Sequence, residues 1–404
     1  MTDLLILFLF LTAAIAVTLL FLQGAFHILR LSHTPARRFL MLAKDFVQSK
    51  QYALALHRAV NNPVLPKGSS HFDAGAVMNP GAVVHDGRVH LFYRAVGMDG
   101  VSRIGYASSP DGLHFDERLP YPVYALASSG NARNAELRKQ YDPELYAKLY
   151  ASGGSWDGVE DPRATIIDGR LYLTFSAFQG WDSLRIGVVS IPEEHLARKK
   201  WTWSQPVFLS APGDVQKNWI LFPRKINGKF ALLHGFRKGT RRRANVAYFT
   251  TLDAEPSEHL QSDYGYADEI DENVWDSRIR GFGAPPIETP HGWLAFYHAN
   301  DVHEPHRYKL GAVLLDRDDP TKILARSREP VLEPDMPYEN EGKPGVVYAT
   351  GAIIKDGLLV VYYGGADNVI CAAAAPAKAF IEALRTETRP KMRRMAAASM
   401  PLPA

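Results

Sequence analysis

The pattern of apolar and polar positions repeats five times along the middle of the chain, starting near residue 72. Each repeat contains a two-residue turn signal, and the five signals are Asp86-Gly87, Asp168-Gly169, Asn227-Gly228, His291-Gly292 and Asp356-Gly357. Asx-Gly pairs readily adopt the positive φ angles that a two-residue hairpin turn needs. The pattern therefore predicts one β-hairpin in each repeat.

A short apolar or aromatic run follows every turn signal, at 90–93, 171–175, 230–233, 293–297 and 358–363. A further strand-like run follows some of them, as at 103–107 and 308–313. Five repeats of one hairpin plan predict an all-β, five-bladed β-propeller rather than a sandwich, because every blade of a propeller repeats the same unit. Helical patterns in this body are confined to an insert near 131–150 and to Ala377–Arg385.

The N-terminus departs from this pattern, because residues 4–22 contain no charged side chain. A helix of this length spans about 28 Å, enough for the hydrocarbon core of a membrane. A buried globular helix and a cleaved signal peptide are the alternatives, but the basic residues that begin a signal peptide are missing. Basic residues follow the run, which predicts a single-pass anchor with the catalytic domain in the cytoplasm; they are Arg30, Arg37, Arg38 and Lys44.

These patterns divide the chain into four parts. We expect a transmembrane anchor at 1–30, a helical linker at 31–60, the propeller at 61–388 and a basic disordered tail at 389–404. The 404-residue chain has a net charge of +3, which is too small to indicate a nucleic-acid binder. Its one cysteine, Cys371, excludes an intramolecular disulfide and a cysteine-based zinc site. The sequence contains no metal motif and leaves the oligomeric state open.

Chemistry is expected where each inner strand begins, because the blades of a propeller start at its axis. The residues at these entries would meet at the central mouth; they are Asn79, Asp161, the pair Arg224 and Lys225, and Gly351.

The stretches around these entries resemble glycoside hydrolase family 130, the mannoside phosphorylases and related mannosidases. The resemblance rests on an ordered set of motifs over roughly residues 58–375. They are Asn79-Pro80-Gly81, Glu160-Asp161-Pro162-Arg163, Leu221-Phe222-Pro223-Arg224-Lys225, Gly283-Ala284-Pro285-Pro286, Tyr297-His298 and Gly364-Gly365-Ala366-Asp367. The fold that the resemblance implies is a five-bladed propeller, in agreement with the repeat count.

The resemblance also implies roles for individual residues. Asp161 would be the general acid, delivering its proton through a hydroxyl of the bound mannose while inorganic phosphate attacks and inverts the anomeric carbon. The family's sugar-binding positions fall on Asn79, Arg94, Arg103 and Asp367, and Glu160 and Tyr308 are further candidates for binding the substrate. Its phosphate-binding position falls on Lys225, and the candidate companions that would complete a cationic cluster are Arg224, Arg278, Arg280 and His298. No cofactor is implied; phosphate would be a co-substrate, and the partners would be a mannoside and the membrane.

Local geometry bears on two of these roles. Arg163 would share the face of Asp161 on a regular strand, and its positive charge would lower a pKa that a general acid needs raised. Glu160 would point away from Asp161, so substrate binding and a structural hydrogen bond both stay open for it. Three tryptophans are candidate platforms for stacking a sugar, with packing as the alternative; they are Trp156, Trp181 and Trp219.

Phosphorolysis and hydrolysis both stay open. Family phosphorylases carry an arginine just after the central strand of the second blade, where this chain has Ala177-Phe178-Gln179-Gly180. A hydrolase would instead use water and a carboxylate base, for which the candidates are Asp268, Glu269, Asp271 and Glu272. Glycosyl transfer from a sugar 1-phosphate and a non-catalytic sugar-binding propeller are the remaining alternatives. The presence of Asp161 disfavours the last of these.

Overall fold

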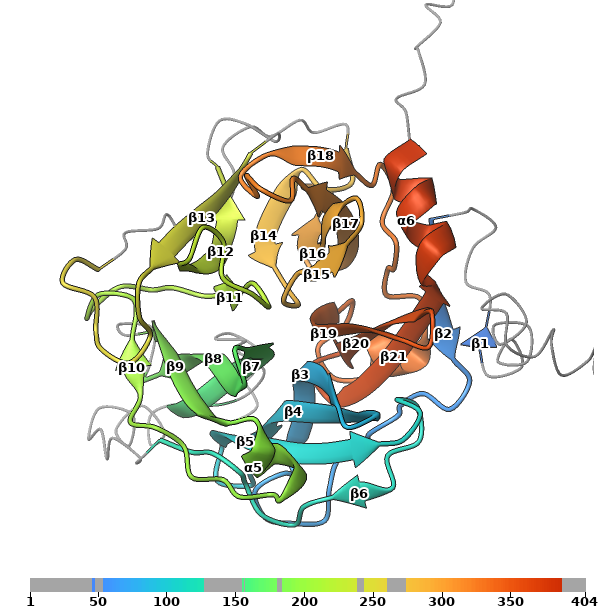
Figure 1. Cartoon of the computed structure of the whole chain (residues 1–404). Coiled ribbons are helices and arrows are strands. Elements are labelled where there is room, and N and C mark those ends of the chain that lie inside the picture. Colours follow the sequence, from blue (N-terminus) through green and yellow to red (C-terminus); the bar gives the residue numbers. More distant parts are fainter. Residues whose placement is uncertain are drawn as a thin grey trace, which may run out of the picture.

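A computed structural model describes residues 46–47, 54–126, 155, 157–179, 184–237, 243–259 and 274–386. In this part of the chain, antiparallel strands form five units arranged around a central axis (Figure 1). The described fold is an all-β, five-bladed propeller.

The first two blades belong to one continuous sheet. Blade one consists of β3 (Ala76–His85), β4 (Arg88–Val96), β5 (Val101–Ser109) and β6 (Glu117–Arg118). Blade two consists of β7 (Asp157–Ile167), β8 (Arg170–Phe178), β9 (Leu184–Pro192) and β10 (Val207–Phe208). A short parallel contact joins them, in which Val101 and Ser102 of β5 pair with Asp157 and Gly158 of β7.

The other blades are separate sheets. Blade three contains β11 (Ile220–Leu221), β12 (Phe230–Phe236) and β13 (Ala244–Phe249). Blade four contains β14 (Arg278–Phe282), β15 (Ile287–Thr289), β16 (Gly292–Asn300), β17 (Lys309–Leu315) and β18 (Ile323–Arg326). Blade five contains β19 (Val347–Lys355), β20 (Leu358–Gly365), β21 (Val369–Pro376), β2 (His57–Ala59) and β1 (Phe46–Val47).

Helices are short in the described residues. The helix predicted after the last repeat is confirmed as α6 (Ala377–Thr386), which buries Phe380 against Phe296 of blade four. Helix α5 (Glu194–Ala197) follows β9, and the 3-10 helix η2 (Pro337–Glu339) precedes β19. The helix expected near 131–150 lies outside the described residues.

Four of the five predicted hairpin turns have the expected backbone. Asp86, Asp168, Asn227 and Asp356 have φ angles of 46°, 49°, 51° and 52°, and a glycine with positive φ follows each. The fourth turn in the chain differs, because only Gly292 has a positive φ there. The Thr289 hydroxyl donates to the Gly292 carbonyl and accepts from the His291 amide, so a side chain bridges this turn.

Glycines allow the inner strands of neighbouring blades to approach closely. A Cβ on Gly81 of β3 would lie 2.7 Å from the Pro162 carbonyl oxygen of β7. A Cβ on Gly351 of β19 would lie 2.5 Å from the Pro80 carbonyl oxygen of β3. Real Cβ atoms do not come so close to backbone oxygens, so both positions require glycine. The glycines therefore bring β3, β7 and β19 together around the axis.

The ring closes through the N-terminal part of the body. Strand β2 pairs with β21, so the outer part of blade five comes from the start of the described chain. The Arg58 guanidinium on β2 binds the fully buried Glu339 carboxylate of η2, with Nε 2.7 Å from Oε1 and Nη2 2.9 Å from Oε2. Tyr363 of β20 donates to the same carboxylate at 2.8 Å.

The structure corrects three expectations about the N-terminal region. No helix in the described part of the chain is long and apolar enough to cross a membrane, and residues 4–22 lie outside that part. The transmembrane helix, the membrane partner and the membrane-anchored, cytoplasmic location are therefore withdrawn.

The helical linker expected at 31–60 is corrected where it is described, because β1 and β2 pair there as strands of blade five. That blade begins before the expected boundary at 61. The basic tail at 389–404 lies outside the described residues.

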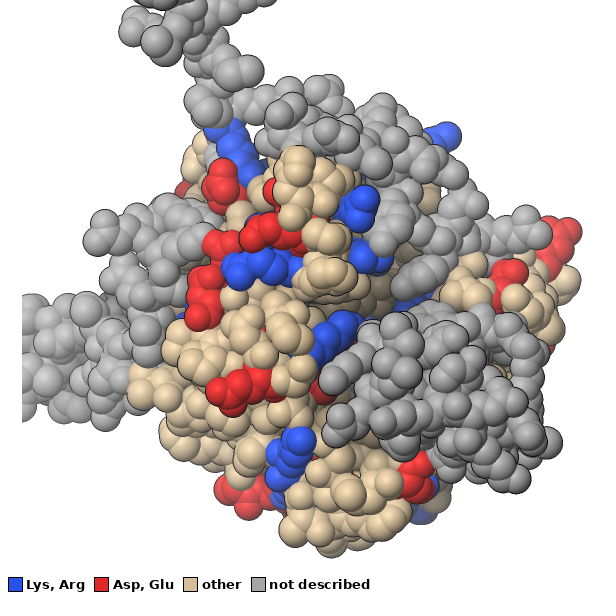
Figure 2. All heavy atoms as spheres, turned by 180° about the vertical axis from the view of Figure 1, so that it is seen from behind, with Lys and Arg blue, Asp and Glu red and all other residues tan. Residues whose placement is uncertain are grey.

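Charges of both signs are mixed over the face of the molecule shown in Figure 2. Lysine and arginine side chains alternate there with aspartate and glutamate among the coloured residues, without one large basic area. A nucleic-acid binder typically gathers its basic residues on one face. This face has no such arrangement among the residues drawn in colour, and the chemistry is sought at the axis instead.

Candidate active site

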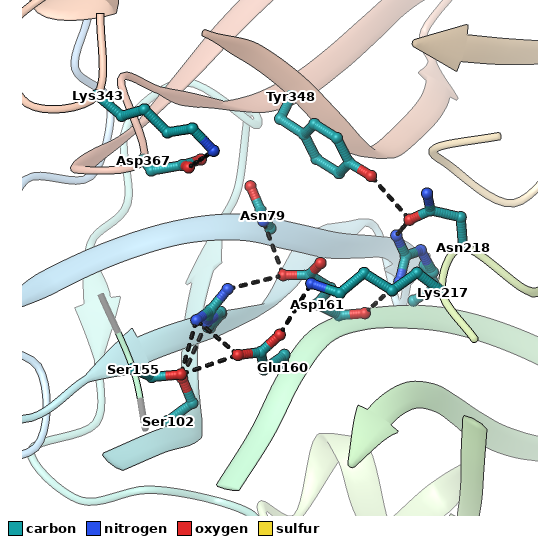
Figure 3. Close-up of polar contacts among 12 residues, drawn as sticks. Asn79, Ser102, Ser155, Glu160, Asp161, Lys217, Asn218, Lys343, Tyr348 and Asp367 are labelled. Carbon is teal, nitrogen blue, oxygen red and sulfur yellow. Dashed lines mark hydrogen bonds and ion pairs between the residues drawn. The ribbon is translucent and has the colours of Figure 1, made fainter. Parts of the chain in front are cut away.

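Two backbone irregularities near the axis bring Asn79 and Asp161 together. The pairing of β3 with β4 shifts between Met78 and Gly81, and that of β7 with β8 shifts between Glu160 and Arg163. Such bulges insert an extra residue and re-aim side chains. Asn79 and Asp161 have φ angles of 47° and 51°, and each is buried. Asn79 Nδ2 donates to Asp161 Oδ1 at 2.7 Å (Figure 3).

The same bulge changes the expected direction of Glu160. Arg94 Nη2 donates to Glu160 Oε1 at 2.9 Å, and its Nη1 lies 3.4 Å from Asp161 Oδ1. Adjacent carboxylates therefore share one guanidinium, whereas a regular strand would place them on opposite faces. The expectation that Glu160 points away from Asp161 was wrong, because the register shift begins at Glu160.

Two serines fix the position of Arg94. Its Nε donates to Ser102 Oγ at 2.9 Å, and its Nη2 donates to Ser155 Oγ at 2.9 Å. Ser155 in turn donates to Glu160 Oε1 at 2.8 Å (Figure 3). A buried ion pair persists only where further hydrogen bonds satisfy its remaining groups, as they do here.

Lys217 is a site residue that the sequence did not reveal. Its ammonium lies 3.2 Å from Glu160 Oε2, and its side chain is 10% exposed. It stands three residues before β11, at the axial start of blade three. The only sequence signal is this place before the inner strand, which would have pointed to Lys217 rather than to Lys225.

The cations around Asp161 determine its charge. Burial alone would raise its pKa, but the charges of Arg94, Lys217 and Arg163 outweigh burial, and together with the Asn79 hydrogen bond they lower the pKa to about 2. Asp161 is therefore ionised at neutral pH in the absence of ligands.

The charge of Arg163 lowers the pKa of Asp161, but its guanidinium makes no hydrogen bond to the Asp161 carboxylate. Its Nη1 donates to the backbone oxygen of Asp161 at 2.7 Å, and its Nη2 donates to Asn218 Oδ1 at 2.8 Å. Its Nε donates to the Gly283 carbonyl at 3.2 Å. The conflict expected between Arg163 and an acidic Asp161 is thus present in the charge, although no hydrogen bond joins the two side chains.

His298 is completely buried and neutral. Burial lowers its pKa to about 3, with a further contribution from the charge of Arg163. Its Nε2 accepts a hydrogen bond from the Ala349 amide at 2.8 Å, so the proton of the neutral ring resides on Nδ1. Nδ1 has no partner among the described residues. The ring stacks on Tyr348 with a centroid distance of 3.8 Å. His298 therefore offers a buried hydrogen-bond donor, its Nδ1–H group.

A second group lies beside Tyr348 and joins three predicted residues, Asp367, Tyr308 and Arg280, to Lys343, which was not predicted. Lys343 pairs with Asp367 Oδ2 at 3.2 Å (Figure 3). The Lys343 ammonium also lies 5.5 Å from the centre of the Tyr308 ring. The Arg280 guanidinium lies 5.2 Å from the same ring. The Tyr308 and Tyr348 rings are 6.2 Å apart, which connects this group to the stack on His298.

Lys225 does not lie with these residues. Its ammonium is 2.9 Å from Asp168 Oδ2, in the turn that ends β7, and 4.7 Å from the centre of the Phe230 ring. Asp168 follows Asp161 by seven residues, and extended chain of that length spans on the order of 20 Å. Its predicted phosphate contact is therefore corrected, because Lys225 belongs to the opposite end of the inner strands.

The remaining candidates are dispersed. Arg103 Nη2 pairs with Asp99 at 2.7 Å rather than with Asp161. Trp219 is 1% exposed, next to His234, and its ring is closed to stacking with a sugar. The other candidates lie outside the described residues; they are Trp156, Trp181, Asp268, Glu269, Asp271 and Glu272.

Comparison with known proteins shows to which family the chain belongs. The glycoside hydrolase 130 family model, described as beta-1,4-mannooligosaccharide phosphorylase, matches residues 43–386. A 1,2-beta-oligomannan phosphorylase from Thermoanaerobacter sp. (strain X514) is 36% identical over 331 residues, covering 78% of this chain and 96% of that protein. A beta-1,2-mannobiose phosphorylase from the same organism is 32% identical and covers 78% and 95%.

A solved structure has the same fold. The beta-1,2-mannobiose phosphorylase from Listeria innocua, in complex with beta-1,2-mannobiose, aligns with a TM-score of 0.59 at 24% identity. The alignment covers 82% of this chain and 99% of that one. The family resemblance noted in the sequence is confirmed, as is the prediction of an enzyme of this kind. The chain belongs to glycoside hydrolase family 130.

Proposed function

We propose that this protein is an inverting β-mannoside phosphorylase with β-1,2-linked manno-oligosaccharides as substrates. The observation that carries this proposal is the buried Asp161 carboxylate among three cations, Arg94, Lys217 and Arg163. The linkage is taken from the two Thermoanaerobacter relatives, whose names specify β-1,2-mannosides.

In the proposed reaction a phosphate oxygen attacks the anomeric carbon as the bond from that carbon to the leaving oxygen breaks. The leaving oxygen receives a proton that originates on Asp161 and passes through a mannose hydroxyl. The products are mannose 1-phosphate, with inverted configuration, and a shortened saccharide.

Phosphate binding would prepare Asp161 for this role. Without ligands the neighbouring cations keep the carboxyl ionised. A phosphate anion beside the same cations would offset their positive potential and raise the pKa of Asp161, as any nearby negative charge does. Proton uptake by Asp161 would thus follow phosphate binding, and the low pKa of the ligand-free site is compatible with an acid.

The proposed phosphate site lies around Asn218. Asn218 is adjacent to Lys217, accepts from Tyr348, which stacks on His298, and donates to the Arg280 carbonyl. Lys217 replaces Lys225 as the lysine of this site. The Nδ1 proton of His298 is a donor without a protein partner among the described residues, which supports His298 as a phosphate ligand.

The sugar would bind next to Asp161. Asn79 Oδ1 is buried and has no partner in the described structure, so it can accept a hydrogen bond from a sugar hydroxyl. The remaining sugar contacts proposed from the family are Arg94, Arg103, Glu160, Tyr308 and Asp367.

The test is a product assay on the full chain. β-1,2-Mannobiose and β-1,4-mannobiose would each be incubated with and without inorganic phosphate, and mannose 1-phosphate and free mannose would be quantified. We expect phosphate-dependent release of mannose 1-phosphate, faster from the β-1,2 disaccharide. Equal release of free mannose with and without phosphate would instead establish hydrolysis, which the absent arginine at 177–179 favours. Adding mannose 1-phosphate and mannose would measure the reverse transfer.

A further inference from the structure

Asn218 connects the inner parts of three other blades. Its Oδ1 accepts from Arg163 Nη2 of blade two at 2.8 Å and from the Tyr348 hydroxyl of blade five at 2.8 Å (Figure 3). Its Nδ2 donates to the Arg280 carbonyl of blade four at 3.1 Å. Asn218 itself leads into β11 of blade three and is 3% exposed. One amide therefore links residues from four blades.

The backbone of Asn218 adds a second constraint. Its φ is 65°, in the left-handed region that asparagine tolerates better than most residues. A Cβ on the neighbouring Gly281 would lie 3.1 Å from Asn218 Nδ2, so blade four packs closely against the amide. Lys217 precedes this fixed residue, and its ammonium reaches Glu160 at 3.2 Å.

Asparagine suits these requirements better than its close relatives. Glycine would adopt the φ angle but would have no amide group. Aspartate would accept the two hydrogen bonds but could not donate to the Arg280 carbonyl, and its charge would oppose an anion nearby. The groups that Asn218 holds, Lys217, Arg280 and, through Tyr348, His298, are those around the proposed phosphate site.

We propose that Asn218 is a positioning residue for phosphate, because it fixes the relative places of Lys217, Arg280 and the Tyr348–His298 stack contributed by different blades. This inference rests on the proposed phosphorylase function. Asn218 acts through these groups rather than through the sugar, whose proposed contacts with Asn79 and Arg94 do not involve its amide.

The test compares the Michaelis constants for the two substrates. In phosphorolysis of β-1,2-mannobiose, Asn218→Gly is expected to raise the KM for phosphate about 10- to 100-fold, the range for loss of charge-assisted contacts. The KM for mannobiose should change by no more than about threefold. A merely structural role would lower the amount of folded enzyme and leave both constants unchanged.

Tyr348→Phe provides a milder second variant. It removes only the hydroxyl that donates to Asn218 and keeps the ring on His298, so we expect a smaller increase in the phosphate KM. The double variant should be no worse than Asn218→Gly alone, because both changes interrupt one network. The Tyr348→Phe variant alone also tests the proposal if Asn218→Gly does not fold.

Asn227→Gly is the matched control. Asn227 lies in the same blade with a similar φ of 51°, but in an exposed hairpin turn, and this variant should keep both constants. The proposal is overturned if the folded Asn218 and Tyr348 variants keep the wild-type KM for phosphate, or if both substrate constants rise equally. Failure of the proposed function is distinguishable, because the wild-type enzyme would then release mannose at a rate independent of phosphate.

Discussion

The two ends of strand β7 place an aspartate in the same backbone conformation but in opposite surroundings. Asp161 near the axial end has a φ of 51°, and Asp168 in the hairpin turn has a φ of 49°. The Asp161 side chain is 4% exposed and the Asp168 side chain is 64% exposed. An aspartate in the left-handed backbone region therefore occurs in a bulge beside buried cations near one end of β7. At the other end of the strand, an aspartate in the same region occurs in a solvated turn. Backbone conformation alone does not distinguish the two.

The largest expected contrast is catalytic. Asp161→Asn should lower turnover by at least about 100-fold, because general acids contribute about 10²–10⁴-fold. Asparagine keeps the shape and tolerates the φ angle, so the thermal unfolding transition should stay cooperative. Asp168→Asn makes the same chemical change at the other end and should leave turnover within about twofold. An Asp161 variant with a tenth of wild-type activity would remove the acid assignment.

The two lysines near the ends of blade three give the next contrast. Lys217→Ala should raise the KM for phosphate about 10- to 150-fold, which corresponds to about 1.5–3 kcal/mol for a lost charged donor. Lys225→Ala removes a lysine whose ion pair is partly exposed and should leave that constant unchanged. Steady-state kinetics with varied phosphate checks both. The reverse ranking would restore the assignment made from the Phe-Pro motif.

Substitutions at two glycines of blade one are expected to differ in their effect on the free energy of unfolding. Gly81→Ala should reduce the free energy of unfolding by about 1–3 kcal/mol, because the new methyl group would meet backbone atoms of β7 at 2.7 Å. Gly87→Asn at the turn should cost little, since no atom lies within 4 Å of its Cβ and asparagine accepts a positive φ. Denaturant unfolding of both variants measures the difference; equal losses would show that the close approach of β3 and β7 is relaxed in solution.

The smallest expected effect is in acid stability. The pKa of Asp161 in the folded protein, about 2, is below the ordinary value of 3.8, so its ionisation stabilises the fold above about pH 4. That contribution, at most about 2 kcal/mol, is lost as the pH falls through about 2. The free energy of unfolding should therefore fall more steeply between pH 4 and 2 in the wild-type protein than in Asp161→Asn. Parallel curves would indicate that the cations do not hold the carboxylate ionised.

The sequence predicted the turn ends of the strands better than the axial ends. An Asx-Gly pair fixes a hairpin locally, and only the His291 turn departed, because the Thr289 side chain bridges it. At the axis, Asp161 of blade two meets Arg94 of blade one and Lys217 of blade three, so no local pattern predicts that these groups meet. The side chain of Glu160 was predicted to point the wrong way because the alternation of a regular strand cannot anticipate a bulge.

The misassignment of Lys225 has a simple geometric origin. Asn79 and Asp161 each precede their turn by seven residues, whereas Lys225 precedes Asn227 by only two. The Phe222-Pro223 motif follows β11 rather than leading into it, so the axial entry of blade three is at Lys217 and Asn218. Counting seven residues back from Asn227 leads to Ile220 in β11, and both residues lie two to three positions before it.

Closure of the ring has a consequence for the order of events during synthesis. The Asn62 side chain binds the backbone of Ala372, and the two are 310 residues apart in the chain. At about 5–20 residues per second, a ribosome needs about 15–60 s to make the chain between them. During this interval β2 cannot pair with β21, because β21 has not yet been made. The last blade made is completed by strands from the start of the described chain, so the active site at the axis can form only when translation is nearly finished.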